Sequence, residues 1–183
     1  RIWINAVPRL FDAPAILEVL ARHGVIFVLI GGYAAGLQGS PYATNDIDIS
    51  PAQDPDNYGR LSAALVELDA MIRAENTEPL PFSHDAQSLA DVAVWNLTAK
   101  FGDLDISTVP SGTQGFPDLR RDAFTITVRG VDVQVASLAD IVRSKDAAGR
   151  TKDKLVLPVL RELVAEETKA RAEARRRKPP KPR

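Results

Sequence analysis

Residues 25–50 read VIFVLIGGYAAGLQGSPYATNDIDIS, a stretch that predicts two strands joined by a glycine turn and a short helix. Residues 25–30 are all apolar, as in a strand that is buried on both faces in the middle of a covered sheet. Gly31 and Gly32 follow that strand, and the small residues after them predict a short helix packed close to the sheet. Residues 45–50 then predict a second strand, in which aspartates alternate with isoleucines.

The rest of the chain adds helices and short strands around this stretch. We expect helices at 14–23, 54–68, 137–148 and 152–170, one helical turn after Ser83, and strands at 71–74, 92–98, 104–108, 124–128 and 131–135. The turns at Phe101-Gly102-Asp103 and Arg129-Gly130 join the last four strands into two hairpins. Because strands and helices do not alternate regularly, we expect an α+β or mixed α/β fold, with a mixed sheet flanked by helices.

The composition limits the class of protein. A chain of 183 residues with 45% hydrophobic and 26% charged residues is expected to form a single soluble domain. It has no cysteine and only two histidines, which excludes disulfides, thiolate metal sites and a zinc centre built on imidazoles, so any metal is held by carboxylates. The longest apolar run, residues 25–30, is far shorter than the roughly 20 residues that span a bilayer, and no stretch resembles a signal peptide. We therefore expect a cytoplasmic protein with no membrane partner.

Charge divides the chain into two parts. The formal net charge is −1, but residues 169–183 contain eight Lys or Arg and one Glu. Residues 1–168 then hold 15 basic and 23 acidic residues and carry about −8. We expect one domain over 1–168 and a basic, disordered tail over 169–183. The tail is either a solvated end or an arm that contacts nucleic acid phosphates.

Asp46 and Asp48 give the first chemical signal. Residues i and i+2 of a strand point to the same face, about 6.6 Å apart, while Ile47 and Ile49 anchor the strand in the core on the other face. Two converging carboxylates repel each other unless a cation compensates, and Mg²⁺ prefers carboxylates together with phosphate oxygens. The pair is therefore a candidate Mg²⁺ site, although an acidic sheet edge or the acid pair of a glycosyltransferase has the same pattern.

Two further features point to phosphate chemistry. Glycines such as Gly31 and Gly32 at the end of a buried strand let backbone N–H groups approach a phosphate, or else they only permit a tight turn. Asp105 lies between two aliphatic residues in a predicted strand and projects from it as the first two aspartates do. Three carboxylates on one face can hold two metal ions about 3.5–4 Å apart for phosphoryl or nucleotidyl transfer.

Lys145 is the last signal of this kind. It follows Leu138, Ile141 and Val142 on the apolar stripe of a predicted helix, where a lysine needs an anionic partner or must extend to the solvent. A triphosphate that is bound to the metals supplies such a partner. Arg150 and the lysines after it add positive charge nearby, and we expect Asp146 and Asp153 to orient these cations.

Together these motifs resemble the nucleotidyltransferase superfamily with the DNA polymerase β-like core. The resemblance covers roughly residues 15–160 and is carried by LIGGYAA (29–35), GSP (39–41), TNDIDI (44–49), DLD (103–105) and SKDAAGR (144–150) with Lys152-Asp153. Within the superfamily, the chain is most similar to the AbiEii/MenT group of toxin–antitoxin nucleotidyltransferases. The resemblance implies an enzyme that transfers NMP from an NTP to an acceptor hydroxyl.

The resemblance also implies roles for single residues. The catalytic set is Asp46, Asp48, Asp105 and Lys145, in which the three aspartates hold two Mg²⁺ ions and the lysine contacts the triphosphate. The nucleotide-binding set is Gly31, Gly32, Ser40, Thr44, Lys145, Arg150 and Asp153. Asp105 either holds one metal ion or accepts the proton of the acceptor hydroxyl. Thr44 is a candidate regulatory phosphorylation site, because a phosphate there repels both the carboxylates and the triphosphate.

The implied acceptor is the 3′ end of tRNA, and the implied role is that of the toxin in a toxin–antitoxin pair, with a cognate antitoxin as partner. Two alternatives remain open. The chain is a nucleotidyltransferase that modifies a small molecule such as an antibiotic, or it is a non-catalytic antitoxin or binding module with the same fold. The complete set of three acids argues against the non-catalytic alternative.

Overall fold

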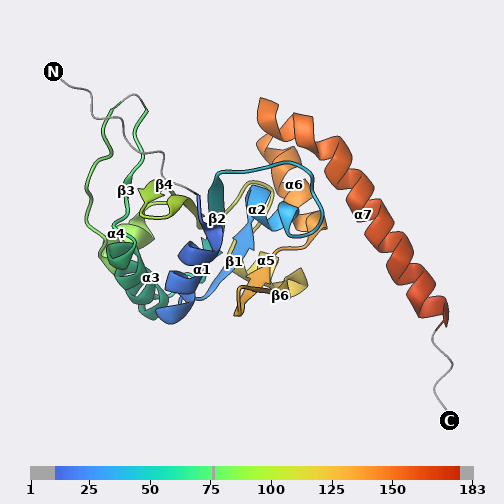
Figure 1. The fold of residues 1–183 in the computed structure, drawn as a ribbon, viewed down its shortest axis with the longest axis horizontal. Coiled ribbons are helices and arrows are strands. Elements are labelled where there is room, and N and C mark those ends of the chain that lie inside the picture. The colour runs from blue at the N-terminus through green and yellow to red at the C-terminus, as the bar shows by residue number, and fades with distance from the viewer. Residues whose placement is uncertain (1–10, 76, 178–183) are drawn as a thin grey trace, which may run out of the picture.

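The computed structural model of the chain describes residues 11–75 and 77–177, and Figure 1 shows its fold. The helices are α1 (Ala13–Arg22), α2 (Gly31–Gly36), α3 (Pro55–Glu67), α4 (Ala86–Asp91), α5 (Phe116–Asp122), α6 (Leu138–Ala148) and α7 (Thr151–Arg177). The strands are β1 (Phe27–Ile30), β2 (Asp46–Pro51), β3 (Met71–Ile72), β4 (Val94–Ala99), β5 (Gly102–Ser107), β6 (Phe124–Val128) and β7 (Val131–Val135).

All these strands form one mixed sheet in the order β3-β4-β5-β2-β1-β7-β6. β2 is parallel to β5 and β1 is parallel to β7, while the other neighbouring strands are antiparallel. The predicted mixed sheet and both predicted hairpins are therefore confirmed. β1 lies inside the sheet with Val28 and Leu29 fully buried, as its uniformly apolar sequence predicts.

Helices cover both faces of the sheet. Ile47 and Ile49 of β2 are fully buried in the core, as are large apolar side chains of α1 and α3: Ile16, Leu17, Leu20, Leu61 and Leu65. Each such side chain stabilises the fold by about 1.5–3 kcal/mol relative to exposure. Figure 1 shows α1 and α3 together on one side of the sheet and α6 and α7 on the other. The alternation along β2 thus leaves Asp46 and Asp48 on the face opposite to the isoleucines.

Side-chain caps fix where α1, α3 and α6 begin. Asp12, Asp54 and Ser137 each accept a hydrogen bond from a backbone N–H in the first turn of α1, α3 and α6, respectively. α6 ends at Gly149, which has a left-handed conformation that favours glycine, and its N–H donates to the carbonyl of Lys145. α7 begins two residues later, so this turn places Lys145 and the start of α7 side by side.

Two stretches differ from the prediction. The sequence does not predict α5, because this helix has only seven residues and its N-cap is Gly115, which has no side chain to mark a helix start. α7 extends to Arg177, so residues 169–177, which the composition assigns to a disordered tail, continue a helix. Lys, Ala, Arg and Glu all favour helix, and the first proline after this stretch is Pro179.

Figure 1 shows the C-terminal part of α7 leading away from the sheet. Residues 178–183 of the predicted tail lie outside the described residues. None of the helices within the described ranges has the length and apolar character that crossing a bilayer requires.

Candidate active site

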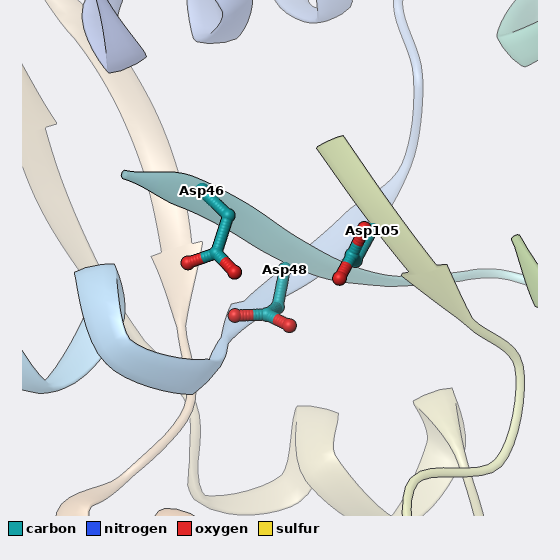
Figure 2. Close-up of side chains that lie close together, drawn as sticks. All are labelled: Asp46, Asp48 and Asp105. Atoms are coloured by element: carbon teal, nitrogen blue, oxygen red, sulfur yellow. The ribbon is translucent and has the colours of Figure 1, made fainter. Parts of the chain in front are cut away.

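Three carboxylates lie together on one face of the sheet. Asp46 and Asp48 are on β2, and Asp105 is on the neighbouring parallel strand β5, where it is the register partner of Asp48. One carboxylate oxygen of each aspartate lies within 4.8 Å of those of the other two. Figure 2 shows the three side chains on these two strands. The structure thus brings together all three aspartates that the sequence indicates.

Asp48 is the carboxylate whose ionisation is most strongly opposed. Burial, and then the charges of Asp46 and Asp105, raise its pKa to about 7, although Lys145 and Lys152 partly offset this. A cation bound among the three aspartates would offset the repulsion between their charges and favour the ionised form of Asp48. All the donor atoms are carboxylate oxygens, the ligands that Mg²⁺ prefers. The residues therefore fit a magnesium site.

Gly31 gives the Asp48 carboxylate the space that it occupies. A Cβ atom on Gly31 would lie 1.9 Å from Asp48 Oδ2, and the backbone of Gly31 is in the left-handed region with φ at +72°. Both features require glycine. The sequence predicts that the glycine turn admits a phosphate, and the structure shows in addition that it admits the side chain of a candidate metal ligand.

Ser40 and Thr44 lie in the loop between α2 and β2 and line the same cleft as the aspartates. Thr44 Oγ1 donates a hydrogen bond to Asp46 Oδ1. Thr44 also packs against Gly32, where an added Cβ would lie 3.1 Å from Thr44 Oγ1. β2 begins at Asp46, so Thr44 lies just before the strand and contacts the acid site from there.

The cations of the site come from the junction of α6 and α7. Lys145 Nζ lies 3.0 Å from Asp153 Oδ1, and Arg150 Nε lies 2.6 Å from Asp153 Oδ2. Burial opposes the ionisation of Asp153, but hydrogen bonds from Arg150 and Lys145 outweigh it and hold the pKa of Asp153 below its usual range. Asp153 is fully buried and is not among the residues that line the cleft. It orients the two cations, as the sequence predicts, but it does not line the cleft where the resemblance implies a nucleotide contact.

The aspartates and cations share one cleft of about 490 Å³, a size typical of small-molecule sites. Residues expected at the site form one part of its wall: Gly31, Gly32, Ser40, Thr44, Lys145, Arg150 and Lys152. Other wall residues were not predicted: Tyr42, Val94, Asn96, Ser107, Pro110 and Ser111. Val94 and Asn96 carry no chemical signal in the sequence, and they reach the cleft only because β4 pairs with β5.

Arg73 is a further functional candidate that the sequence does not reveal. Its Nη2 donates to both carboxylate oxygens of Asp105, at 2.7 and 2.9 Å, and its Nη1 lies 2.7 Å from Asp103 Oδ2. Burial raises the pKa of Asp105, and Arg73 acts against that rise. Asp105 lies 32 residues further along the chain than Arg73, so only the pairing of β3, β4 and β5 brings them together.

Comparison with known proteins shows which solved structures share this fold. No protein-family model and no curated protein matches the sequence. Among solved structures, a candidate nucleotidyltransferase from Thermotoga maritima, TM1012, matches with a TM-score of 0.50 and 20% identity over 83% of this chain and 89% of that chain. Lincosamide antibiotic adenylyltransferase LnuA, solved with lincomycin bound, matches with a TM-score of 0.56 and 15% identity over 85% of this chain and 99% of that chain. The chain therefore has the mixed α/β fold of these nucleotidyltransferase structures.

Proposed function

We propose that the chain is a Mg²⁺-dependent nucleotidyltransferase that transfers NMP from an NTP to the hydroxyl of an acceptor. The observation that carries this proposal is the convergence of three carboxylates within 4.8 Å of one another, in a cleft that Lys145 and Arg150 also line. The fold supports it, since two structures that share the fold bear nucleotidyltransferase names.

In the proposed reaction, the acceptor oxygen forms a bond to the α-phosphorus, and the bond from that phosphorus to the bridging oxygen of pyrophosphate breaks. Mg²⁺ on Asp46 and Asp48, and in a two-ion form on Asp105 as well, would stabilise the charge on the attacking and leaving oxygens. Asp105 is also placed to accept the proton of the hydroxyl. Lys145 and Arg150 bind the pyrophosphate as it leaves, because both are cations in the same cleft.

The loop side of the cleft binds the rest of the triphosphate in this proposal. Gly31, Gly32, Ser40 and Thr44 line the cleft beside the two aspartates of β2. They offer backbone N–H groups and hydroxyls, which suit phosphate oxygens. Asp153 contributes indirectly, by holding the two cations in place.

Two classes of acceptor have support. An RNA 3′ end, such as that of tRNA, is supported by exposed cations near the end of α7, including Lys169, Arg171 and Arg176. A small hydroxylated molecule is supported by the likeness of the fold to LnuA, a lincosamide antibiotic adenylyltransferase. The role as a toxin, with a cognate antitoxin as partner, rests on the sequence resemblance.

A transfer assay with both acceptor classes tests the proposal. The full chain is incubated with Mg²⁺ and each of the four NTPs, labelled at the α-phosphate, together with total tRNA or with a panel of lincosamides and aminoglycosides. Label on the RNA supports the RNA acceptor, and label on one of the antibiotics supports the small-molecule acceptor. A folded chain that labels neither, with any NTP, would count against the proposed activity.

Removing residues 169–183 tests the RNA acceptor. If these cations pair with RNA phosphates, the logarithm of the affinity falls with the logarithm of the salt concentration, by about 0.7 to 0.9 for each phosphate neutralised. We expect the truncated chain to bind tRNA more weakly and with a smaller salt slope. Its KM for NTP should be unchanged, because the cations that line the cleft belong to residues 145–152. Filter binding at several salt concentrations measures the affinity for tRNA and its salt slope. Equal slopes for the truncated and full chains would refute the role of these cations.

Thr44→Glu imitates phosphorylation at the edge of the site. The added carboxylate would lie beside Asp46, with which Thr44 shares a hydrogen bond, and would repel the triphosphate. We expect transfer to fall by at least about tenfold, since a charge at this distance is worth more than 1.4 kcal/mol. Thr44→Val is the matched control, because it keeps the shape of the side chain and adds no charge. Full activity of Thr44→Glu would refute regulation at this position.

A further inference from the structure

Arg73 joins two aspartates of β5 on the face of the sheet that carries the site. Asp103 and Asp105 are two residues apart on the strand, so their side chains project to the same face. The guanidinium lies between them, with Nη1 2.7 Å from Asp103 Oδ2 and Nη2 2.7 Å from Asp105 Oδ1. The backbone N–H of Arg73 donates to the carbonyl of Asn96 on β4, which fixes where the side chain starts.

This arrangement makes Asp105 differ from the other two aspartates of the site. Among the described residues, Asp105 has an ion pair to a cation, whereas Asp46 and Asp48 have none. Lys145 and Arg150, two cations that line the cleft, direct their ion pairs to the buried Asp153. The charge of Arg73 is therefore the one placed in contact with the group of three carboxylates.

We infer that Arg73 is a positioning residue that competes with metal for Asp105 and thereby keeps the affinity for free metal low until a nucleotide binds. The inference rests on the proposed function. A divalent cation among the three aspartates must share Asp105 with a guanidinium that already donates to both of its oxygens. The phosphates of a nucleotide add negative charge, which favours the metal again. The same two hydrogen bonds fix the plane of the carboxylate for the reaction.

Two substitutions separate the charge of Arg73 from its geometry. Arg73→Lys keeps the charge, but an ammonium cannot bond both oxygens of Asp105 and Asp103 in the fixed fork of a guanidinium. Arg73→Gln removes the charge and most of the contacts that the guanidinium makes with the two aspartates. Arg129→Gln is the control, because Arg129 is an exposed arginine that pairs with an aspartate, Asp12, outside the site.

The test measures Mn²⁺ binding without nucleotide, by electron paramagnetic resonance of the full chain at constant pH and ionic strength. We expect Arg73→Gln to bind Mn²⁺ at least about threefold more tightly than wild type, because a competing positive charge is gone. Arg73→Lys and Arg129→Gln should stay within about twofold of wild type. In the transfer assay, both Arg73 variants should lower kcat by about tenfold with little change in KM for NTP, because orientation is lost while the cations that hold the phosphates remain.

An unchanged or weaker Mn²⁺ affinity in Arg73→Gln would overturn the inference, as would wild-type kcat in both Arg73 variants. If circular dichroism shows that Arg73→Gln does not fold, Asp103→Asn decides. In that variant Arg73 loses its ion pair with Asp103 and keeps the one with Asp105, so Mn²⁺ binding should weaken. Tighter or equal binding would overturn the inference. If wild type transfers no nucleotide, the proposed function fails, but the comparison of Mn²⁺ affinities still decides the role of Arg73.

Discussion

Asp48→Asn should lower nucleotide transfer by about 10³-fold, equivalent to about 4 kcal/mol, while it makes the metal-free protein more stable. Asparagine fills the same space but cannot supply the negative charge that holds Mg²⁺. The gain in stability follows from the site itself, where burial and two neighbouring carboxylates raise the pKa of Asp48 to about 7. The folded chain is therefore less stable when Asp48 is ionised.

The pH dependence of stability shows the direction in which ionisation of Asp48 changes the free energy of unfolding. Because the pKa of Asp48 is higher in the folded chain than in the unfolded chain, the folded state retains the proton more tightly as pH rises from about 4 to about 7. The contribution of Asp48 to the free energy of unfolding falls across that window and is constant above it. Asp48→Asn should lack this fall and should be about 2 kcal/mol more stable than wild type at pH 8, after allowance for screening.

Thermal unfolding across this pH range, with and without Mg²⁺, measures these effects. We expect Mg²⁺ to raise the melting temperature of wild type at pH 8 and to leave that of Asp48→Asn nearly unchanged. Asp132→Asn is the matched control, since Asp132 is an exposed strand aspartate on β7 that lies outside the group of three acids. Near wild-type transfer by Asp48→Asn would contradict the metal assignment.

Gly31→Ala should impair both the fold and the reaction. The new methyl group would lie 1.9 Å from Oδ2, 2.5 Å from Cγ and 2.8 Å from Cβ of Asp48, so the whole side chain of Asp48 must move. Alanine at a φ of +72° adds about 1–2 kcal/mol of backbone strain. We expect the free energy of unfolding to fall by about 2–4 kcal/mol and transfer to fall by at least about 10²-fold, since a candidate metal ligand is displaced.

Gly36→Ala is the control for this substitution, because both glycines belong to α2 and, apart from its chain neighbours and the backbone of its own helix, no described atom lies within 4 Å of a Cβ built at Gly36. Alanine in a helix is favoured over glycine by up to about 1 kcal/mol, so stability should be equal or higher and activity should be retained. Chemical denaturation gives the stability, and transfer of α-labelled NMP gives the activity. Equal activity of the two variants would show that the position of Asp48 does not depend on Gly31.

The local part of the site can be predicted from the sequence. Asp46 and Asp48 share a strand face because of the two-residue period of a strand, and the same rule places Ile47 in the core. The group formed by Lys145 and Arg150 is also local, because a single helix end joins them. Such features depend on neighbours in the chain, which the sequence displays directly.

The rest of the site depends on contacts between distant segments. Arg73 reaches Asp105 only after β3, β4 and β5 pair, and a lone arginine after a two-residue strand gives no sign of that partner. Asp153 reads as a polar residue near a helix start, and its complete burial becomes visible only when α6 packs on α7. The requirement for Gly31 is likewise set by a carboxylate on another strand.

The position of the transferred phosphate distinguishes nucleotidyl transfer from other reactions of an NTP at this site. The full chain is given Mg²⁺, an acceptor and an NTP labelled at either the α- or the γ-phosphate, with Asp48→Asn in parallel. We expect the α-label to become attached to the acceptor and the γ-label to appear in pyrophosphate, and both results should require Mg²⁺ and Asp48. Attachment of the γ-label to the acceptor, or equal transfer by Asp48→Asn, would contradict the proposed function.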